Sequence, residues 1–255
     1  MDRLHTQIYG LIGYPLGHSF SRDYFNKKFE TEGINAEYVN FEIPTIEEFP
    51  SVVARNSNLS GLNVTIPYKE KVISMLDALD ATAEAIGAVN VIKVIRNSRG
   101  QIAKLKGFNS DVIGFMDSIR DLLRPYHKKA LVLGTGGASK AVSYGLRQLG
   151  VEPTCVSRTK AEGRYTYHGL SLHPEIVSEH MVIVNTTPLG MYPNVDKCPD
   201  LPYDYITPEH LCYDVLYNPD TTLFMRKCAE HGATTKNGLE MLLMQAFAAW
   251  NIWRQ

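Results

Sequence analysis

A lysine and two serines stand in short polar turns where a carbonyl and a carboxylate could be bound. Lys69 ends the turn that begins at Gly61, just past a predicted strand. An ammonium there could donate a proton to a carbonyl oxygen as a hydride arrives, and accept it back in reverse. Ser19 and Ser21 follow the first predicted strand, and two hydroxyls in one turn can point at one carboxylate. The alternatives are a solvated surface charge for Lys69 and a helix N-cap for Ser21.

A glycine-rich turn, Gly134-Thr-Gly136-Gly137-Ala138-Ser139, follows another predicted strand. Glycines let the chain turn sharply and bring backbone N–H groups against a pyrophosphate, and the helix that opens there presents its positive end. A strand precedes this turn, and a helix and a further strand follow it, which is the context that dinucleotide binding requires. The alternative is a tight strand-to-helix turn that binds no ligand.

The end of the next strand bears on which dinucleotide would bind. The sequence there is Ser157-Arg158-Thr159-Lys160, with no carboxylate until Glu162. An acidic residue would hydrogen-bond the ribose 2′-hydroxyl of NAD, whereas a guanidinium pairs with the 2′-phosphate of NADP. Arg158 therefore favours NADP over NAD, unless it is a solvated loop charge.

Alternating strand and helix patterns must position these residues, and they predict an α/β protein with mostly parallel strands. In the run after Ala36, apolar and polar residues alternate, which predicts a strand with one apolar face. The apolar set is Val39, Phe41 and Ile43, and the polar set is Tyr38, Asn40 and Glu42. The other predicted elements of this half are strands at Gln7–Ile12 and Leu62–Ile66, a helix at Ser21–Glu32 ended by Gly33, and a hairpin of Val89–Ile95 with Gln101–Lys106.

The second half repeats this alternation. A helix is predicted after Asp111, which could simply cap it. The predicted strands are Ala130–Leu133, Val151–Ser157, Met181–Asn185 and Cys212–Val215, and a long apolar helix follows Leu239. These patterns predict two domains: an open α/β unit at 1–106, onto which helix 239–255 packs back, and a Rossmann-like nucleotide-binding unit at 107–238.

Composition excludes several classes of protein. The 255 residues are 44% apolar and 21% charged, with a formal net charge of −1, so nothing attracts nucleic acid or an anionic membrane at long range. The four cysteines contain no Cys-x-x-Cys pair and are expected to be buried free thiols, and the eight histidines have no metal-ligand spacing. The N-terminus lacks the order of a signal peptide, and no apolar stretch reaches the roughly 20 residues of a membrane span. We therefore expect a cytoplasmic protein without a metal, either monomer or homodimer.

Taken together, these segments resemble the shikimate dehydrogenase family, in one order and over nearly the whole chain. The motifs that carry the resemblance are Gly13 to Ser21, Asn63 to Lys69, Gly87-Ala-Val-Asn90, Gly107 to Asp111, the glycine turn, Asn185 to Met191, Asp214 to Pro219, and Asn237 to Gln245. The resemblance implies a two-domain enzyme that reduces 3-dehydroshikimate to shikimate with NADPH, in aromatic amino-acid biosynthesis.

The resemblance also implies residue roles. Lys69 and Asp111 would form the catalytic acid–base pair, with Asp111 orienting the lysine. Ser19 and Ser21 would hold the substrate carboxylate, and Tyr217 would close the site near the substrate. The ring hydroxyls would be held by Asn63, Thr65, Asn90, Asp111 and Gln245. The cofactor would be held by Gly134, Gly136, Gly137, Ala138 and Ser139 at the pyrophosphate, by Ser157, Arg158 and Thr159 around the 2′-phosphate, and by Thr187, Met191 and Gly238 at the nicotinamide.

Two alternatives stay open within this resemblance. One is a quinate or dual quinate/shikimate dehydrogenase with relaxed use of NAD and NADP. The relaxed cofactor use is suggested by the segment from Thr159 to Met181, which is shorter than the family pattern. The other is a non-catalytic sensor that binds the same acid, against which the presence of both Lys69 and Asp111 argues.

Overall fold

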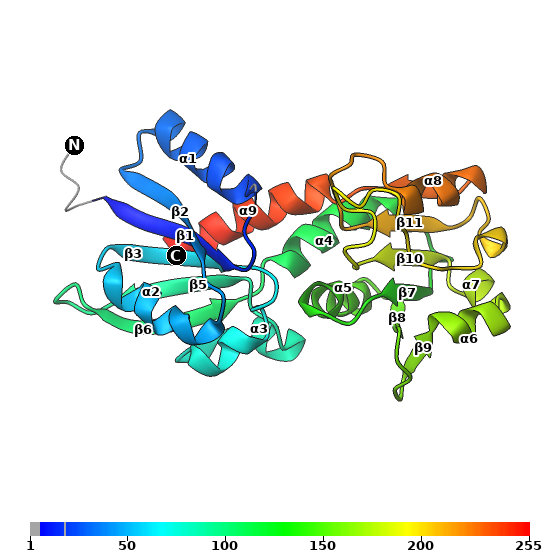
Figure 1. Ribbon diagram of the computed structural model, residues 1–255, viewed down its shortest axis with the longest axis horizontal. Helices are drawn as coiled ribbons and strands as arrows, with labels where there is room; N and C mark the ends of the chain where they lie inside the picture. Colours follow the sequence, from blue (N-terminus) through cyan, green and yellow to red (C-terminus); the bar gives the residue numbers. More distant parts are fainter. Residues whose placement is uncertain (1–5, 18) are drawn as a thin grey trace. The chain divides into compact units, whose positions relative to one another are not determined.

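The computed structural model describes residues 6–17 and 19–255, which form two compact units (Figure 1). The first unit runs to Ser110 and includes Ala246–Gln255, and the second is Asp111–Gln245. The last helix, α9 (Leu239–Arg254), therefore contributes residues to both units. No helix among the described residues is long and apolar enough to cross a lipid bilayer.

Within the described residues of the first unit, six strands form a mixed sheet in the order β2-β1-β3-β5-β6-β4. The pairs β1–β2, β1–β3 and β4–β6 are parallel, and β3–β5 and β5–β6 are antiparallel, so the expected hairpin is confirmed. The strands are β1 (Gln7–Gly13), β2 (Ala36–Glu42), β3 (Leu59–Val64), β4 (Ala78–Leu79), β5 (Val91–Arg96) and β6 (Ile102–Phe108). The helices are α1 (Phe20–Glu32), α2 (Phe49–Arg55) and α3 (Ala81–Ile86), with single 3₁₀ turns η2 (Ile46–Glu48) and η3 (Lys71–Met75).

Both faces of this first sheet are covered (Figure 1). A mainly aliphatic cluster, which includes Leu62 and also Phe49, lies under α2 on one face. The other face carries an aromatic cluster from α1, the strands and α9, which includes Phe25, Tyr38 and Trp253. The Trp253 indole N–H also donates a 3.1 Å hydrogen bond to the Ile92 carbonyl, which anchors the end of α9 to this sheet.

Three predictions about this unit are wrong in detail. The pattern of β2 predicted a single apolar face, but both faces of the strand are packed, and Tyr38 from the polar set is 1% exposed. Strand β3 begins at Leu59 and ends at Val64, rather than spanning 62–66. Helix α1 is capped by Ser19, whose hydroxyl accepts a 3.2 Å hydrogen bond from the Arg22 N–H, so the alternative that Ser21 is the N-cap is wrong.

The second unit is a parallel sheet in the order β12-β11-β10-β7-β8-β9. Renumbered along the chain this is 3-2-1-4-5-6 read from β9, the doubly wound order of a Rossmann fold, so that prediction is confirmed. The strands are β7 (Lys129–Leu133), β8 (Glu152–Ser157), β9 (Arg164–Thr166), β10 (Val182–Asn185), β11 (Leu211–Asp214) and β12 (Thr234–Lys236). The helices are α4 (Asp111–Ile119), α5 (Gly137–Gln148), α6 (Tyr167–Leu172), α7 (Glu175–Glu179), α8 (Leu223–Glu230) and the start of α9, with 3₁₀ turns η4 (Arg120–Leu122) and η5 (Tyr203–Tyr205).

The sequence patterns did not predict several short elements. The edge strands β9 and β12 have only three residues each, too few to show a period. The segment after Thr159, which is shorter than the family pattern, contains β9 and the short helices α6 and α7. The four cysteines are free thiols as expected, although Cys155 and Cys198 are only half-buried.

Candidate functional site

The glycine turn lies at the switch point of the second sheet, between β7 and α5. Strand order reverses here, and in such sheets ligands bind outside the carboxyl ends of the strands. The Gly134 N–H donates to the Val156 carbonyl at 2.9 Å, so the turn is fastened to β8. Gly134 has φ +117°, and a Cβ there would lie 2.7 Å from the Thr186 hydroxyl oxygen. The protein's own packing therefore requires this glycine.

Gly136 differs, because nothing in the protein requires its glycine. Its φ is −85°, which any residue adopts, and a Cβ there would meet no atom within 4 Å. It is the N-cap of α5, whose first N–H groups point out of the helix at Gly137 and Ala138. The open space over a helix N-terminus fits a pyrophosphate brought against the backbone. Ser139 is 2% exposed and donates its hydroxyl to the Gly136 carbonyl at 2.7 Å, so it holds the shape of the turn.

The segment after β8 presents the cation expected at the 2′-phosphate. Ser157 is buried and donates its hydroxyl to the Thr159 carbonyl, which folds the chain so that Arg158 lies at the apex. Arg158 is exposed, and its charge lowers the pKa of Tyr167, although burial raises that pKa further, to about 12. An exposed guanidinium beside a tyrosine ring can meet both a phosphate and the adenine that carries it.

A buried hydrogen-bond network connects the carboxyl ends of β10 and β11. Asn185 and Asp214 are both 0% exposed, and the Asn185 amide donates to the Asp214 carboxylate at 3.1 and 3.2 Å. The carboxylate also accepts from the Thr222 hydroxyl at 2.6 Å and from the Leu216 N–H at 3.0 Å. Burial nevertheless raises the pKa of Asp214 to about 6. No role for Asn185 or Asp214 was predicted from the sequence, although each residue begins a motif of the family resemblance.

This network shapes the loops that carry the predicted nicotinamide residues. The Asn185 amide oxygen accepts from both the Thr187 N–H, at 3.0 Å, and the Thr187 hydroxyl, at 2.7 Å. Met191 lies farther along the same loop and is 47% exposed. On the neighbouring loop Tyr217 is 38% exposed, and partial burial raises its pKa.

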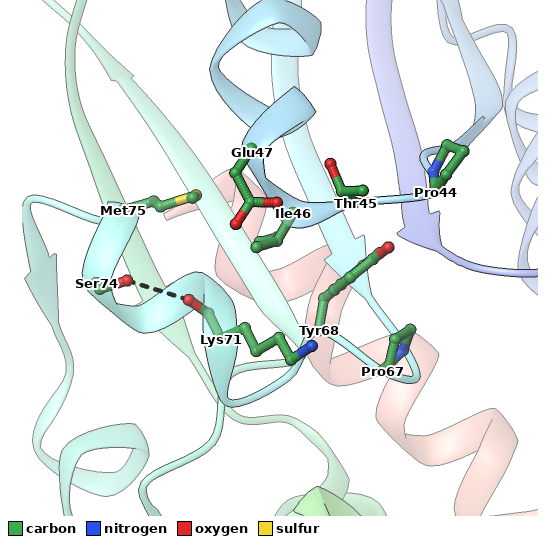
Figure 2. Close-up of a pocket in the computed structure, with 9 residues that line it drawn as sticks. All are labelled: Pro44, Thr45, Ile46, Glu47, Pro67, Tyr68, Lys71, Ser74 and Met75. Atoms are coloured by element: carbon green, nitrogen blue, oxygen red, sulfur yellow. Dashed lines mark hydrogen bonds between the residues drawn. The ribbon is translucent and has the colours of Figure 1, made fainter.

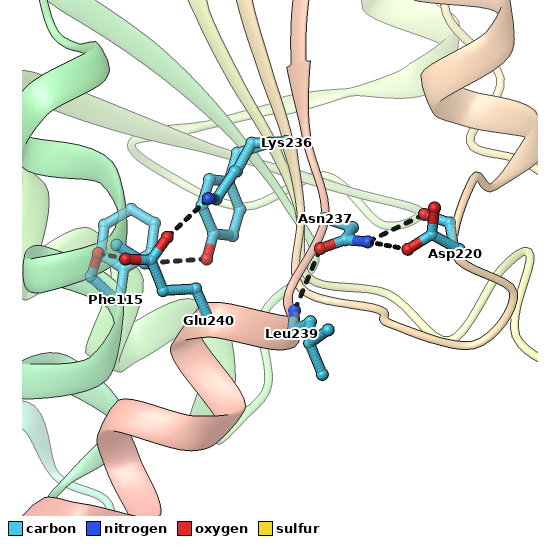
Figure 3. Close-up of polar contacts among 8 residues, drawn as sticks. Phe115, Asp220, Lys236, Asn237, Leu239 and Glu240 are labelled. Atoms are coloured by element: carbon cyan, nitrogen blue, oxygen red, sulfur yellow. Dashed lines mark hydrogen bonds and ion pairs between the residues drawn. The ribbon is translucent and has the colours of Figure 1, made fainter.

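The start of α9 is fastened to the loop that bears Tyr217 (Figure 3). The Asn237 amide donates to the carbonyl and the carboxylate of Asp220, at 3.0 and 2.8 Å, and its oxygen accepts from the Leu239 N–H. Gly238 lies very close to the chain just after β11. Its N–H donates to the Leu216 carbonyl, and a Cβ there would lie 2.0 Å from the Val215 carbonyl oxygen. Gly238 is thus a position where only glycine fits.

Besides Tyr217, two residues assigned to the substrate belong to this second unit. Asp111 is the first residue of α4 and is 7% exposed. Gln245 lies on α9, where its amide donates to the Leu242 carbonyl at 2.9 Å. The two helices approach closely, because a Cβ at Gly114 of α4 would lie 2.5 Å from the Met241 carbonyl oxygen of α9.

In the first unit, the predicted substrate residues follow the carboxyl ends of β1 and β3. Ser19 and Ser21 lie at the start of α1, with Ser19 7% exposed. Asn63 is on β3 and is 6% exposed, and Thr65 follows the strand, where its N–H donates to the Ile12 carbonyl at 2.8 Å. Parallel strands β1 and β3 are hydrogen-bonded neighbours, so their carboxyl ends meet at one edge of the sheet.

Asn90 joins several of these residues. Its carbonyl accepts from the Asn63 amide at 3.2 Å, and its own amide oxygen accepts from the Ser110 N–H at 2.6 Å. Its amide nitrogen donates to the Ser110 hydroxyl at 3.0 Å. The preceding residue, Val89, donates its N–H to the Lys69 carbonyl at 2.7 Å. The structure therefore brings Asn63, Asn90 and the backbone of half-buried Lys69 together, and it anchors Ser110, the residue before Asp111, to the same cluster.

A cavity of about 560 Å³ lies beside this cluster, between η2 and η3 (Figure 2). Its lining includes Tyr68 and Lys71, but none of the residues predicted for the substrate. Figure 2 shows the Ser74 hydroxyl bonded to the Lys71 carbonyl, at 3.2 Å, within a single 3₁₀ turn. Lys71 is therefore a second lysine, two residues after Lys69, that lines this cavity and not the polar cluster of Asn63 and Asn90.

Comparisons with known proteins bear on both units. Residues 11–92 match the family model of the shikimate dehydrogenase substrate binding domain. A shikimate dehydrogenase (NADP(+)) of Desulforamulus reducens is 37% identical, over 97% of this chain and 90% of the relative. The crystal structure of shikimate dehydrogenase from Aquifex aeolicus superposes with a TM-score of 0.84 at 36% identity, covering 99% of this chain and 94% of that one. The shikimate 5-dehydrogenase of Listeria monocytogenes, solved with shikimate and NAD, gives 0.84 at 29% identity, covering 98% and 92%.

Proposed function

The chain belongs to the shikimate dehydrogenase family of NADP-dependent oxidoreductases, and on that premise we propose that it reduces 3-dehydroshikimate to shikimate with NADPH. Two features of the chain together support this proposal. One sheet has the Rossmann strand order and an open glycine turn that fits a pyrophosphate, and the other has a cluster of Asn and Lys residues at its strand ends. The predicted family is confirmed; the catalytic pair and the residue roles stay proposals.

We assign substrate binding to the unit up to about residue 106 and cofactor binding to 107–238, with helix 239–255 serving both. The family model covers only residues 11–92, which supports the first assignment. The second is supported by the strand order and by the fit of Gly136 and the α5 N-terminus to a pyrophosphate. A cytoplasmic location and a monomeric or homodimeric state stay predictions.

The proposed chemistry needs one hydride and one proton. Bound NADPH supplies the hydride to the carbonyl carbon of the substrate. Negative charge that develops on the carbonyl oxygen is stabilised by the Lys69 ammonium, which donates its proton to that oxygen and is reprotonated from solvent. The Asp111 carboxylate orients the lysine. In the reverse direction neutral Lys69 accepts the hydroxyl proton as the hydride leaves.

The remaining residues bind rather than react. Ser19 and Ser21 donate hydroxyls to the substrate carboxylate. Asn63, Thr65, Asn90 and Gln245 hydrogen-bond the ring hydroxyls, and Tyr217 covers the ring. A site built from Ser, Thr, Asn and Gln suits a small acid with several hydroxyls, because each substrate hydroxyl is both donor and acceptor.

The deciding experiment mixes purified protein with 3-dehydroshikimate and NADPH and follows the nicotinamide absorbance. We expect the absorbance to fall, and to rise when shikimate and NADP are supplied. Faster oxidation of quinate than of shikimate would identify a quinate dehydrogenase instead. Tight binding of shikimate without turnover of either acid would identify a sensor and refute the enzyme proposal.

Use of NAD beside NADP is the second candidate, since the related Listeria structure was solved with shikimate and NAD. In this chain the only residue assigned to the 2′-phosphate by its charge is exposed Arg158. The same assay with NADH in place of NADPH measures this preference directly.

A further inference from the structure

Tyr38 of β2 lies in contact with Asn63, one of the residues proposed to bind substrate. Its hydroxyl donates a 2.8 Å hydrogen bond to the amide oxygen of Asn63, which crosses from β2 to β3 over the intervening β1. Complete burial raises the pKa of this hydroxyl, and the Ser21 side chain of α1 lowers that pKa by a smaller amount. The raised pKa keeps the phenol protonated at neutral pH, so it remains a hydrogen-bond donor there.

The ring of Tyr38 is held firmly by its neighbours. Tyr38 is 1% exposed and stacks on Phe25, with ring centroids 5.0 Å apart and planes 13° from parallel. Trp253 of α9 packs at 6.4 Å on the same ring. A tyrosine enclosed in this way has little freedom to move its hydroxyl, so the atom that Asn63 meets is fixed in space.

The two hydrogen bonds of Asn63 settle which way its amide faces. Its oxygen accepts from Tyr38, and one N–H donates to the Asn90 carbonyl at 3.2 Å. Rotating the amide by half a turn would place the NH₂ group against the Tyr38 hydroxyl and the oxygen against a carbonyl oxygen, so both contacts favour the observed orientation. The second N–H of the amide takes part in neither contact, and we assign it to a ligand as a donor.

We propose that Tyr38 is a positioning residue that holds the Asn63 amide as a hydrogen-bond donor to one ring hydroxyl of the substrate. This inference rests on the proposed function for the identity of the substrate, but its physical content is the Tyr38–Asn63 contact. Loss of the Tyr38 hydroxyl leaves a buried amide oxygen without this donor and lets the amide adopt other orientations. The binding of a ring hydroxyl is weakened, and the reacting carbonyl is unaffected.

The kinetic test compares Tyr38→Phe with Tyr9→Phe. Tyr9 belongs to the same aromatic cluster, but its hydroxyl meets Gln7 at 3.3 Å and makes no contact with the proposed substrate residues. We expect Tyr38→Phe to raise KM for 3-dehydroshikimate roughly 3- to 10-fold, the loss of one hydrogen bond, with kcat changed less than about twofold. KM for an analogue that keeps the carboxylate and ketone but lacks the other ring hydroxyls is expected not to rise. Tyr9→Phe is expected to change neither KM.

A double-mutant cycle separates positioning from a general loosening of the domain. In the Asn63→Ala background, Tyr38→Phe is expected to have no further effect on KM, because the residue through which it acts is gone. Additive effects of the two substitutions, an equal rise in KM for substrate and analogue, or an unchanged KM would each overturn the proposal.

A spectroscopic measurement keeps the test independent of turnover. In isotope-labelled protein without ligand, the side-chain amide signals of Asn63, assigned by their loss in Asn63→Ala, are expected to shift in Tyr38→Phe and not in Tyr9→Phe. Shifted signals in a protein that does not reduce 3-dehydroshikimate would refute the proposed function while supporting the contact. Unshifted signals would refute the role of Tyr38 whatever the activity.

Discussion

The Val89 N–H donates a 2.7 Å hydrogen bond to the carbonyl oxygen of Lys69, and the next residue, Asn90, accepts from Asn63. Lys69 therefore has its backbone fixed to the cluster proposed to bind the ring hydroxyls. Its neighbour Lys71, two residues on, lines a separate cavity. The contrast between these lysines provides the first prediction.

Replacing Lys69 by alanine is expected to lower kcat by roughly 10²- to 10⁴-fold, because it removes the group that protonates the carbonyl oxygen. Binding of NADPH, measured by fluorescence titration, is expected to stay the same. Lys71→Ala removes an equal charge from the adjoining 3₁₀ turn and serves as the control, with turnover expected to match the unmodified protein. Full activity in Lys69→Ala would remove this residue from the mechanism.

Replacing Arg158 by alanine is expected to weaken NADPH binding by about 1.5–3 kcal/mol, the scale of a hydrogen bond to a charged group. NADH, which has no 2′-phosphate, is expected to bind nearly as before. Arg147→Ala makes the same change of charge and serves as the control. Arg147 lies in the last turn of α5, at the end opposite the glycine turn, so this substitution is expected to alter neither affinity. Equal losses for both nucleotides would mean that Arg158 does not contact the phosphate.

Gly136→Ala is expected to separate cofactor binding from folding. A Cβ at this position meets no protein atom, and the poorer N-cap is offset by the lower entropy of the unfolded chain, so the free energy of unfolding changes by less than about 1 kcal/mol. The methyl group would occupy the space proposed for the pyrophosphate, so the affinity for NADPH is expected to fall at least about tenfold. Unaltered NADPH affinity in this variant would contradict the proposed cradle.

Gly238→Ala is expected to do the opposite. Its Cβ would lie 2.0 Å from the Val215 carbonyl oxygen, so the backbone must move and the protein loses about 2 kcal/mol or more of unfolding free energy. Denaturant titration of both glycine variants side by side measures this difference. Equal stability of Gly136→Ala and Gly238→Ala would show that the approach of α9 to β11 is not tight.

Asp214 is expected to make the stability of the second unit depend on pH. Burial raises its pKa from 3.8 to about 6 in the folded protein, so folding favours the protonated form. Between these values the folded state binds more protons than the unfolded state, and stability falls as the pH rises from about 4 to about 6. The contribution of this group is about 3 kcal/mol at most. It is lost in full above the folded pKa.

Unfolding measured at pH 4 and pH 7 for the unmodified protein and Asp214→Asn tests this dependence. The amide does not titrate, so the variant is expected to lack this decline, whatever its absolute stability. An identical change between the two pH values in both proteins would mean that another group sets the profile.

Local sequence was sufficient for much of this protein. The glycine turn between a strand and a helix, the hairpin through Gly100, and the long apolar helix at the C-terminus were all predicted, because each depends on residues close together in the chain. The glycine that ends α1, Gly33, and the family motifs in order are likewise local signals. The Rossmann-like class followed from the alternation of strand and helix patterns.

Tertiary structure alone decided which faces are buried and which polar groups meet. The pattern around Tyr38 predicted one apolar face, formed by Val39, Phe41 and Ile43. It did not predict that α1 and α9 cover the other face and bring Phe25 and Trp253 against Tyr38. Asn185 and Asp214 lie 29 residues apart, and their contact arises only because β10 and β11 pair in parallel. A periodic pattern records only whether a side chain is apolar, whereas burial and hydrogen bonding depend on which distant segment packs above it.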